Sequence, residues 1–476
     1  MDSPAPRNGG GAQTKTGVPA ARRPAEVAAA ARAAFATGRT RPLRWRADQL
    51  DGLIRALSNS VSEIQEAMRH DLGKSATEAY LTEIGPVIAE AKLLKKNLSR
   101  WTKNRRVQAP ITLGTSRAWI QREPLGTVLI IGPWNYPFHL LLVPLAGALA
   151  AGNSVVLKPS EIAPATSRLL SKLIPRYLDP DAVKIVEGGV QETTELLDLP
   201  WDHIFYTGNG AVGSIVMAAA AKHLSPVTLE LGGKSPVWVD ESFPIEQAAQ
   251  TLAWAKYANC GQTCVAPDYV LATRDVATRL ARELERSIAG YYGSDPRTSP
   301  DYSRIVNERH ARRLASLLGA GTTVVGGTFD IADRYVSPTV LLDVPMNAPV
   351  MMDEIFGPIL PIVVVHDHHQ AIEFIRQRPK PLALYVFTNR SPVRDDILAK
   401  TSSGGVALNT AMLQLGVSTL PFGGVGASGT GSYHGEQSIK TFSHERSVLR
   451  KLPGPDLTKL ARPPFNARKS KMLTGQ

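Results

Sequence analysis

Residues 127–231 alternate short β-branched runs with helical patterns, and this alternation restricts the possible folds more than any other feature of the sequence. The predicted strands are 127–131, 154–158, 182–186, 203–206 and 227–231, and the predicted helices are 137–151, 165–177, a short helix near Thr193 and one after Gly210. Strands that alternate with helices form a parallel sheet covered on both faces by right-handed crossovers. The sequence therefore predicts an α/β fold, in which ligands bind at the carboxyl ends of the parallel strands.

Residues suited to a dinucleotide follow two of these strands. Lys158 and Glu161 come after the second strand, while Gly208 and Gly213 follow the strand at 203–206 and open the next helix. A lysine and a carboxylate suit ribose hydroxyls, and a helix N-terminus suits a pyrophosphate. Alone, each feature is more often a solvated lysine or a tight turn. Their joint placement on one sheet predicts a dinucleotide-binding sheet.

Three other patterns in the sequence imitate binding motifs. Residues 424–429 match G-x-G-x-x-G, but no strand leads into them and no amphipathic helix follows, so we expect a glycine-rich loop. Residues 232–235 match the end of a phosphate-binding loop, but Thr228 stands where that motif needs its first glycine. Residues 366–369 crowd three histidines without the spacing of a metal centre, so we predict an exposed charged turn and no metal site.

The chain has only two cysteines, Cys260 and Cys264, four positions apart. Such a pair cannot form a disulfide framework, which favours a reducing compartment and a cytoplasmic protein. Cys264 stands among glycine and small polar residues. A thiol is a strong nucleophile as the thiolate and inert when buried among apolar neighbours, and this stretch alone is compatible with either state.

Two carboxylates are further candidates for chemistry. Glu230 closes the strand at 227–231 among apolar residues, where a raised pKa would let it take a proton from water near neutral pH. A structural carboxylate bonded to backbone amides fits the same position equally well. Glu354 and Phe356 stand one residue apart before a Gly-Pro turn.

The remaining segments complete a multidomain chain. Residues 23–101 read as helices, residues 108–122 as strands or an arm, and residues 235–410 as a second α/β region with strands at 270–272, 322–325, 339–342, 359–365 and 382–387 and a helix at 276–290. We expect a disordered basic tail (1–22), a dinucleotide-binding domain (23–107 and 123–230), a catalytic domain (231–408), an oligomerisation arm (108–122 and 409–449) and a basic C-terminal tail (450–476).

The net charge of +12 comes from the two ends of the chain. Residues 1–45 hold eight Lys/Arg and two Asp/Glu, and residues 450–476 hold seven and one, which leaves the body of the chain neutral. This distribution favours solvated tails over a specific nucleic-acid site, with weak attraction of the tails to anionic surfaces as a hypothesis. The most apolar run, residues 137–152, is too short to span a bilayer.

Seven motifs, in order, resemble those of the aldehyde dehydrogenase superfamily, in particular its class 3 branch. They are Gly132–Phe138 (GPWNYPF), Ala151–Glu161, Gly208–Gly213, Leu229–Pro236, Gly261–Tyr269 (GQTCVAPDY), Glu354–Pro358 (EIFGP) and Pro421–Gly435. The resemblance covers residues 29–449, nearly the whole chain apart from the tails. Any one motif could arise by chance, but seven in the right order make an accidental match implausible.

The resemblance implies the roles of three residues. It makes Cys264 the nucleophile that adds to an aldehyde, and it makes the side-chain amide of Asn135, with the backbone N–H of Cys264, the donors that hold the resulting oxyanion. It makes Glu230 the base that activates water to hydrolyse the thioester. The implied product is a carboxylic acid. A dehydrogenase that transfers the acyl group to CoA, or a catalytically silent nucleotide-binding protein, remains an alternative.

The resemblance also implies the binding contacts. It places Lys158 and Glu161 at the adenosine ribose, and the helix after Gly208, with Gly213, at the pyrophosphate. It places Glu354 at the nicotinamide ribose and Phe356 beside the nicotinamide ring. The walls of a pocket for a medium-chain aliphatic or aromatic aldehyde would be Tyr136, Trp254 and Tyr257. Glu161 should repel a 2′-phosphate and favour NAD, with NADP as a second cofactor. The implied assembly is a homodimer. Cys260 either packs as a small residue, the favoured interpretation, or forms an inactivating disulfide with Cys264.

Overall fold

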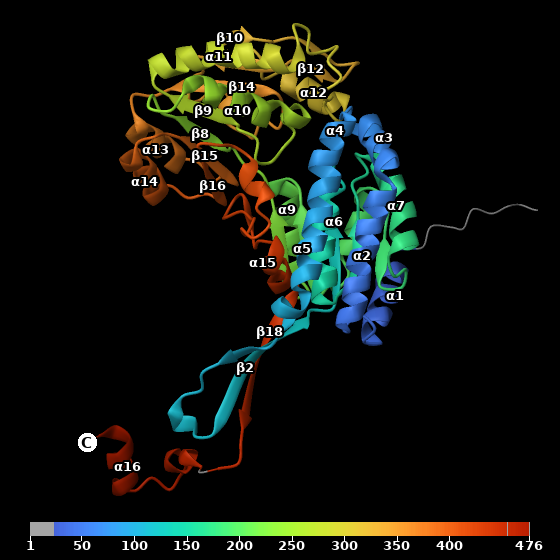
Figure 1. Cartoon of the computed structure of the whole chain (residues 1–476), viewed down its shortest axis with the longest axis vertical. Helices are drawn as coiled ribbons and strands as arrows, with labels where there is room; N and C mark the ends of the chain where they lie inside the picture. The colour runs from blue at the N-terminus through green and yellow to red at the C-terminus, as the bar shows by residue number, and fades with distance from the viewer. Residues whose placement is uncertain (1–22, 455, 476) are drawn as a thin grey trace, which may run out of the picture.

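The computed structural model describes residues 23–454 and 456–475. The chain forms two bodies, each built on an open sheet, and a long β arm that projects away from them (Figure 1). The predicted disordered tail, residues 1–22, lies outside the described residues.

A six-stranded sheet in the order β17-β7-β6-β3-β4-β5 forms the first body. Its strands are β3 (Thr127–Ile131), β4 (Ser154–Lys158), β5 (Val183–Ile185), β6 (His203–Thr207), β7 (Val227–Glu230) and β17 (Gly429–Thr430). The first five strands are parallel, and β17 pairs antiparallel with β7. The sequence predicted these five strands to within one residue at each end. The chain reverses its order between β3 and β6, and dinucleotides bind at such a switch point.

Helices cover both faces of this sheet (Figure 1). One face carries α1 (Pro24–Ala36), α8 (Val190–Leu197) and α9 (Gly210–Ala221), and the other carries α2 (Leu43–Asn59), α3 (Val61–Leu72), α5 (Gly85–Thr102), α6 (His139–Ala151) and α7 (Pro164–Tyr177). The short α4 (Ala76–Ala79) and the π-helical turn η1 (Tyr80–Ile84) join α3 to α5. Helix α6 is apolar on all sides because it is buried along nearly its whole length. Within the described residues, no helix is long and apolar enough to cross a membrane.

A seven-stranded sheet in the order β10-β13-β14-β9-β8-β15-β16 forms the second body. Its strands are β8 (Pro236–Val239), β9 (Tyr269–Ala272), β10 (Thr322–Val325), β13 (Thr339–Leu342), β14 (Ile359–Val364), β15 (Ala383–Phe387) and β16 (Gly405–Leu408), and its helices are α10 (Ile245–Tyr257), α11 (Arg274–Tyr292), α12 (Glu308–Ala315), α13 (His368–Arg376) and α14 (Ser391–Lys400). The five predicted strands and the helix at 276–290 are confirmed. Strands β8 and β16 were not predicted, because four-residue runs beside glycine and proline carry little periodicity.

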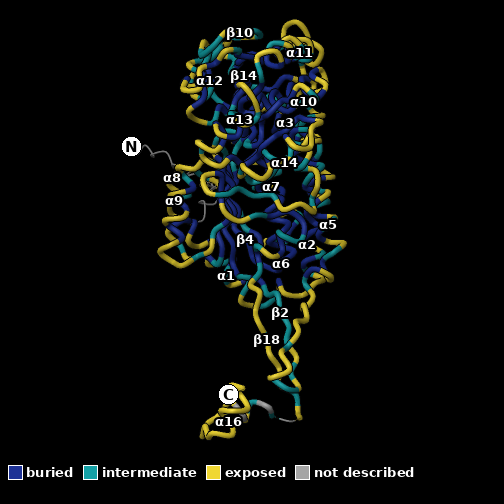
Figure 2. The backbone as a smooth tube through the Cα atoms, turned by 90° about the vertical axis from the view of Figure 1, so that its left-hand side faces the viewer, coloured by how far each residue is buried: buried dark blue, intermediate teal, exposed yellow. Residues whose placement is uncertain are grey.

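Strands from distant parts of the chain build the arm. β18 (Ser443–Lys451) pairs antiparallel with β2 (Ser116–Pro124), and β1 (Arg105–Val107) lies on the other side of β2. Strands β2 and β18 come largely from the two segments assigned to the arm, although residues 111–113 form the 3-10 turn η2 (Ile111–Leu113) and no strand. The arm is largely exposed, and the C-terminal helix α16 (Ala467–Thr474) lies beyond its tip (Figure 2). The proposed division into domains stays a prediction.

Candidate active site

Cys264 lies in the loop between α10 and β9. The residues before it, Asn259, Cys260 and Gly261, have φ angles of 51°, 52° and 71°, so the chain turns sharply. A Cβ on Gly261 would lie 2.3 Å from the carbonyl oxygen of Gly357, which leaves room only for glycine. The turn places Cys264, partly buried, against the core of the seven-stranded sheet.

Two carboxyl groups raise the pKa of the Cys264 thiol. Burial raises the pKa of Cys264 above its usual range, and the charges of Glu354 and Glu230 raise it further. Burial also raises the pKa of Glu230 well above its usual value, and that of Glu354 to about 8. Groups whose pKa values are shifted together in this way mark candidate sites of acid–base chemistry. Two carboxyl groups predicted from separate motifs thus lie close enough to influence the thiol of a third motif electrostatically.

Glu230 ends β7 with its side chain 2% exposed. Its backbone pairs with Gly429 of β17, but neither carboxyl oxygen has a hydrogen-bond partner within the described residues. This excludes the structural carboxylate bonded to backbone amides. A buried carboxyl group with unused acceptors is suited to bind a water molecule and take its proton.

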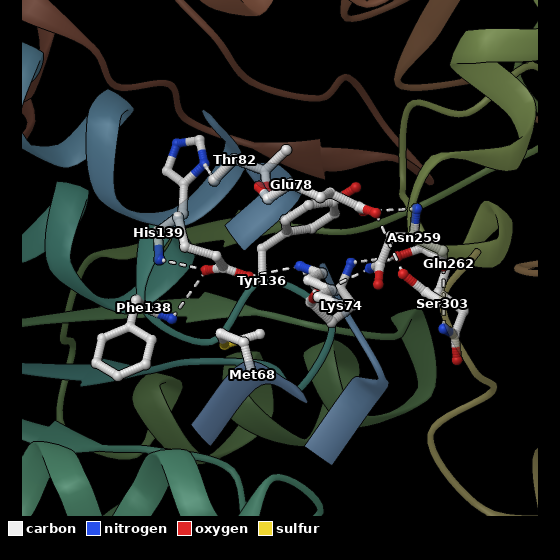
Figure 3. A network of polar contacts seen from close by, with 12 residues as sticks. Met68, Lys74, Glu78, Thr82, Tyr136, Phe138, His139, Asn259, Gln262 and Ser303 are labelled. Atoms are coloured by element: carbon white, nitrogen blue, oxygen red, sulfur yellow. Dashed lines mark hydrogen bonds and ion pairs between the residues drawn. The ribbon is translucent and has the colours of Figure 1, made fainter. Parts of the chain in front are cut away.

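Asn135 follows β3 and is buried. One N–H of its side-chain amide donates to the carbonyl of Gln262 at 3.0 Å, two residues before Cys264. An amide nitrogen has two hydrogens, so the second remains available for another acceptor. The carbonyl of Asn135 accepts bonds from the amide of Asn259 at 2.9 Å and from the ammonium of Lys74 at 3.1 Å, within the network of Figure 3.

The predicted ribose-binding pair lies at the carboxyl end of β4. Lys158 is almost fully buried and donates to the carbonyl of Pro159 at 2.8 Å. Its ammonium lies 3.7 Å from the carboxylate of Glu161, which is about half exposed. Burial lowers the pKa of Lys158, and the nearby Glu161 partly offsets this shift. The ammonium of Lys158 keeps donors for a hydroxyl, and Glu161 keeps acceptors.

The predicted pyrophosphate site lies at the switch point. Gly208 follows β6, and Asn209 caps α9 by accepting a bond from the backbone N–H of Val212 at 3.0 Å. A Cβ on Gly213 would lie 2.8 Å from the side chain of Leu231, so glycine there lets α9 pack closely on the sheet. The N-terminus of α9 therefore stands at the carboxyl edge of β6, as the prediction requires.

Glu354 and Phe356 approach the site from the segment before β14. A Cβ on Gly232 would lie 2.1 Å from Oε2 of Glu354, so the carboxylate occupies the space above a glycine of the β7–β8 loop. The ring of Phe356 stands edge-on to Trp134 at 5.4 Å between centroids, and Phe356 has a φ of 48°. Residues from both bodies thus meet beside Cys264.

The three predicted pocket residues have different environments. The hydroxyl of buried Tyr136 shares a hydrogen bond of 2.6 Å with Thr263, next to Cys264. Trp254, on α10, is 43% exposed. Tyr257 is 1% exposed and donates to the carbonyl of Thr339 at 3.1 Å, within the core of the second body. These contacts make Tyr257 a packing residue, while Tyr136 and Trp254 as pocket walls stay predictions.

Cys260 has surroundings unlike those of Cys264. It is buried, and its thiol donates to the carbonyl of Ser303 at 2.8 Å. Burial raises its pKa, and its electrostatic neighbours are Glu78 and Arg304. Both cysteines are free thiols. The contacts of Cys260 fit the packing role favoured from the sequence.

Two of the imitation motifs have structural roles. The ammonium of Lys234 bonds the carboxylate of Asp268 and the carbonyls of Val350 and Asp353, so it holds the segment before Glu354 and is not free for a phosphate. The glycine-rich stretch 424–429 is a loop that ends in β17, as predicted.

The histidine cluster was wrongly predicted to be a turn. His368 and His369 begin α13, which Asp367 caps through the backbone N–H of Gln370. Their ring nitrogens lie with a carboxylate oxygen of Asp396 within 4.8 Å of one another. Asp396 is also paired with Lys400 at 2.5 Å. The absence of a metal there stays a prediction.

Sequence reasoning missed Lys74, Glu83 and Asp268. Lys74 and Glu83 have fully buried side chains that form an ion pair of 2.6 Å beside Asn135. Asp268 lies within the motif Gly261–Tyr269 but was given no role there, and its carboxylate accepts a bond from the backbone N–H of Ile355 at 3.0 Å. Their neighbours come from distant segments, so no local pattern distinguishes these charges from solvated ones.

Comparisons with known proteins agree with this geometry. The profile of the "Aldehyde dehydrogenase family" matches residues 14–448. The chain is 50% identical over 443 residues to "Aldehyde dehydrogenase family 3 member B1" of Mus musculus, covering 93% of this chain and 95% of the relative. It is 48% identical over 439 residues to "Aldehyde dehydrogenase, dimeric NADP-preferring" of Mus musculus, covering 92% and 97%.

A solved structure, the substrate-bound state of Staphylococcus aureus AldH, superposes with a TM-score of 0.91 at 43% identity and covers 95% of this chain and 98% of that chain. Similarity of this extent in both sequence and structure leaves one conclusion. The chain belongs to the aldehyde dehydrogenase family.

Proposed function

We propose that this protein oxidises aldehydes to carboxylic acids with NAD(P)⁺, using Cys264 as nucleophile, Asn135 as oxyanion donor and Glu230 as base. Membership of the family supports the reaction. The observation that carries the residue roles is the electrostatic effect on the pKa of Cys264 of the carboxyl group of Glu230, which has no hydrogen-bond partner among the described residues.

The residues at the sheet edge fit a dinucleotide. Lys158 and Glu161 offer a donor and an acceptor at the end of β4, and the N-terminus of α9 offers backbone N–H groups. The carboxylate of Glu354 lies over Gly232, where a side chain would displace it. When bound, NAD(P)⁺ supplies the hydride acceptor of the reaction.

The first half of the reaction uses Cys264 and Asn135. The thiol gives its proton to solvent, and the thiolate sulfur forms a bond to the aldehyde carbon, which turns the carbonyl oxygen into an oxyanion. The free N–H of the Asn135 amide and the backbone N–H of Cys264 stabilise that oxyanion without giving up a proton. When the oxyanion re-forms the carbonyl, the carbon releases hydride and a thioester remains on Cys264.

The second half uses Glu230. A water molecule that enters the site donates a hydrogen bond to the carboxylate, which lowers its raised pKa and favours the charged form. Glu230 then takes a proton from this water as the oxygen attacks the thioester carbon. The carbon–sulfur bond breaks, the carboxylic acid leaves, and Glu230 passes its proton to the thiolate, which restores the thiol. One water is consumed and one proton is released per turnover.

Substrate, cofactor preference and assembly are finer parts of the proposal. Tyr136 beside the site supports an aliphatic or aromatic aldehyde of medium length. The acidic side chain of Glu161 supports NAD over NADP, although one relative is named NADP-preferring. The exposed edges of the arm, β1 and β18, support a homodimer, and the same relative is named dimeric. A cytoplasmic location stays a prediction.

The test is a panel of aldehydes followed by NADH and NADPH absorbance, with and without CoA. We expect CoA-independent oxidation that Cys264→Ala abolishes and Asn135→Ala lowers by about a hundredfold, the usual cost of losing one oxyanion donor. Normal turnover by Cys264→Ala would overturn the assignment. A strict requirement for CoA would replace hydrolysis by acyl transfer.

A further inference from the structure

A buried ion pair lies beside the proposed oxyanion donor. Lys74 follows the C-terminal glycine of α3, Glu83 lies in η1, and both side chains are 0% exposed with 2.6 Å between them. Burying two charges costs about as much solvation as their attraction returns. Stability alone therefore does not account for this pair.

The ammonium of Lys74, labelled in Figure 3, makes two hydrogen bonds and one cation–π contact. It donates to Oε1 of Glu83, it donates to the carbonyl of Asn135 at 3.1 Å, and it lies 3.9 Å from the centre of the Tyr136 ring. A lysine ammonium has three hydrogens, and an aromatic face attracts a cation. Lys74 therefore binds two successive residues of the loop after β3, Asn135 and Tyr136.

Glu83 binds the other end of the same loop through hydrogen bonds. Its Oε2 accepts hydrogen bonds from the backbone N–H groups of Phe138 at 3.2 Å and His139 at 3.0 Å, where α6 begins. A carboxylate at a helix N-terminus satisfies donors that have no partner inside the helix. One ion pair thus holds residues 135–139 from both sides.

The same loop is tied to the residues before Cys264. The amide of Asn259 donates to the carbonyls of Asn135 at 2.9 Å and Gln262 at 3.2 Å. The amide of Asn135 also donates to Gln262, and Tyr136 shares a hydrogen bond with Thr263. The position of the Asn135 amide relative to Cys264 therefore depends on these bonds and on the ion pair behind them.

We propose that Lys74 and Glu83 are positioning residues, which hold the Asn135 amide where it meets the oxyanion formed on Cys264. This inference rests on the proposed function. The pair touches neither thiol nor carboxyl base, and it acts through the loop that carries the amide. Releasing the loop by about 1 Å is expected to slow the chemistry by up to about a hundredfold, as small misplacements of catalytic groups do.

The test is a mutant cycle on hydride transfer, measured as pre-steady-state NADH formation. Lys74→Met/Glu83→Gln removes both charges together and leaves neither one unpaired in the interior. We expect it to slow hydride transfer by ten- to a hundredfold. In an Asn135→Ala background the same two changes should cost less than about threefold, because the donor that they position is already absent.

Two further measurements separate positioning from general damage. Alkylation of Cys264 by iodoacetamide forms no oxyanion, and its rate should stay within about twofold, as should the Kd for NAD⁺. Asp240→Asn is the matched control. It breaks the pair between a buried carboxylate and Arg390 beyond the carboxyl end of β8, so it should lower Tm and leave hydride transfer unchanged.

The positioning role would be overturned if the double variant slowed hydride transfer as much in the Asn135→Ala background as in the wild-type protein. It would also be overturned if the double variant slowed alkylation of Cys264 as much as hydride transfer. If the double variant does not fold, Glu83→Gln alone enters the same cycle, because it keeps an acceptor for the backbone N–H groups. Turnover by Cys264→Ala would instead overturn the proposed function, so the two failures are distinguishable.

Discussion

The backbone N–H of Gly208 donates a hydrogen bond of 3.0 Å to the carbonyl of Glu230. This bond joins the loop that opens α9 to the end of β7, where the proposed base lies. The dinucleotide edge and the hydrolytic edge of the site are therefore one continuous structure. Changes at either edge are expected to affect separate steps of one reaction.

Glu230→Gln should separate the two halves of turnover. The side chain keeps its size but no longer accepts a proton from water, so the thioester should accumulate after hydride transfer. We expect steady-state turnover to fall by a hundredfold or more, since general-base catalysis contributes about 10²–10⁴. A burst of about one NADH per site should remain. Loss of the burst together with turnover would place Glu230 in the first half.

Gly232→Ala should weaken cofactor binding through Glu354. The new methyl group would lie 2.1 Å from Oε2 of that carboxylate and must displace it. We expect the KM for NAD⁺ to rise by about tenfold, roughly the loss of one hydrogen bond to a charged group. Gly405→Ala is the control, because a Cβ there meets no described atom within 4 Å. An unchanged KM in Gly232→Ala would remove Glu354 from the ribose site.

Glu354→Gln should shift the reactivity of the thiol to lower pH. Glu354 has a pKa of about 8, so its negative charge opposes the Cys264 thiolate above that pH. Removing the charge lowers the pKa of the thiol. The measurement is the pH profile of iodoacetamide alkylation without cofactor. The control is Asp353→Asn, a change at the exposed neighbouring residue that should leave the pH profile where it is. A coincident profile for Glu354→Gln would contradict the electrostatic contact.

Glu161→Gln should improve the use of NADP. The neutral amide no longer repels a 2′-phosphate, while the ammonium of Lys158, 3.7 Å from the Glu161 carboxylate, still attracts it. We expect the ratio of kcat/KM for NADP to that for NAD to rise by about tenfold. A ratio that does not change would place the 2′-position away from Glu161.

His203 should contribute to acid destabilisation. It is 4% exposed, and burial lowers its pKa from 6.5 to about 4. The folded state therefore binds fewer protons than the unfolded state between these pH values, and stability falls as the pH drops from 6.5 towards 4. At pH 5 the expected contribution is about 2 kcal/mol.

His203→Leu removes this term, so the loss of unfolding free energy between pH 7 and pH 5 should shrink by that amount in urea titrations. Half-buried His139 and buried His434, whose pKa values fall to about 4 and about 3, should keep part of the slope. An unaltered slope would show that His203 binds protons equally in the folded and unfolded states.

Much of the fold followed from the sequence because its signals are local. The β-branched runs around Val128 and Val155 and the helical patterns between them gave strands and crossovers, and the glycines at 208 and 213 lay where the chain must turn or pack closely. The chemistry of Cys264, Glu230 and Asn135 followed from motifs that keep their neighbours in sequence. Short strands such as β8, and the start of helix α13 at His368, gave no such local signal.

The sequence by itself singled out the residues proposed to carry the chemistry and the strands of the first sheet, because strand patterns and motif contents are encoded within short segments. Only the tertiary structure decided the surroundings of each group. It showed that Glu230 has no hydrogen-bond partner among the described residues, that Tyr257 is core, and that Lys74 and Glu83 hold the loop of Asn135. Burial and charge pairing depend on contacts between segments far apart in the chain, and such contacts leave no periodic trace in either segment.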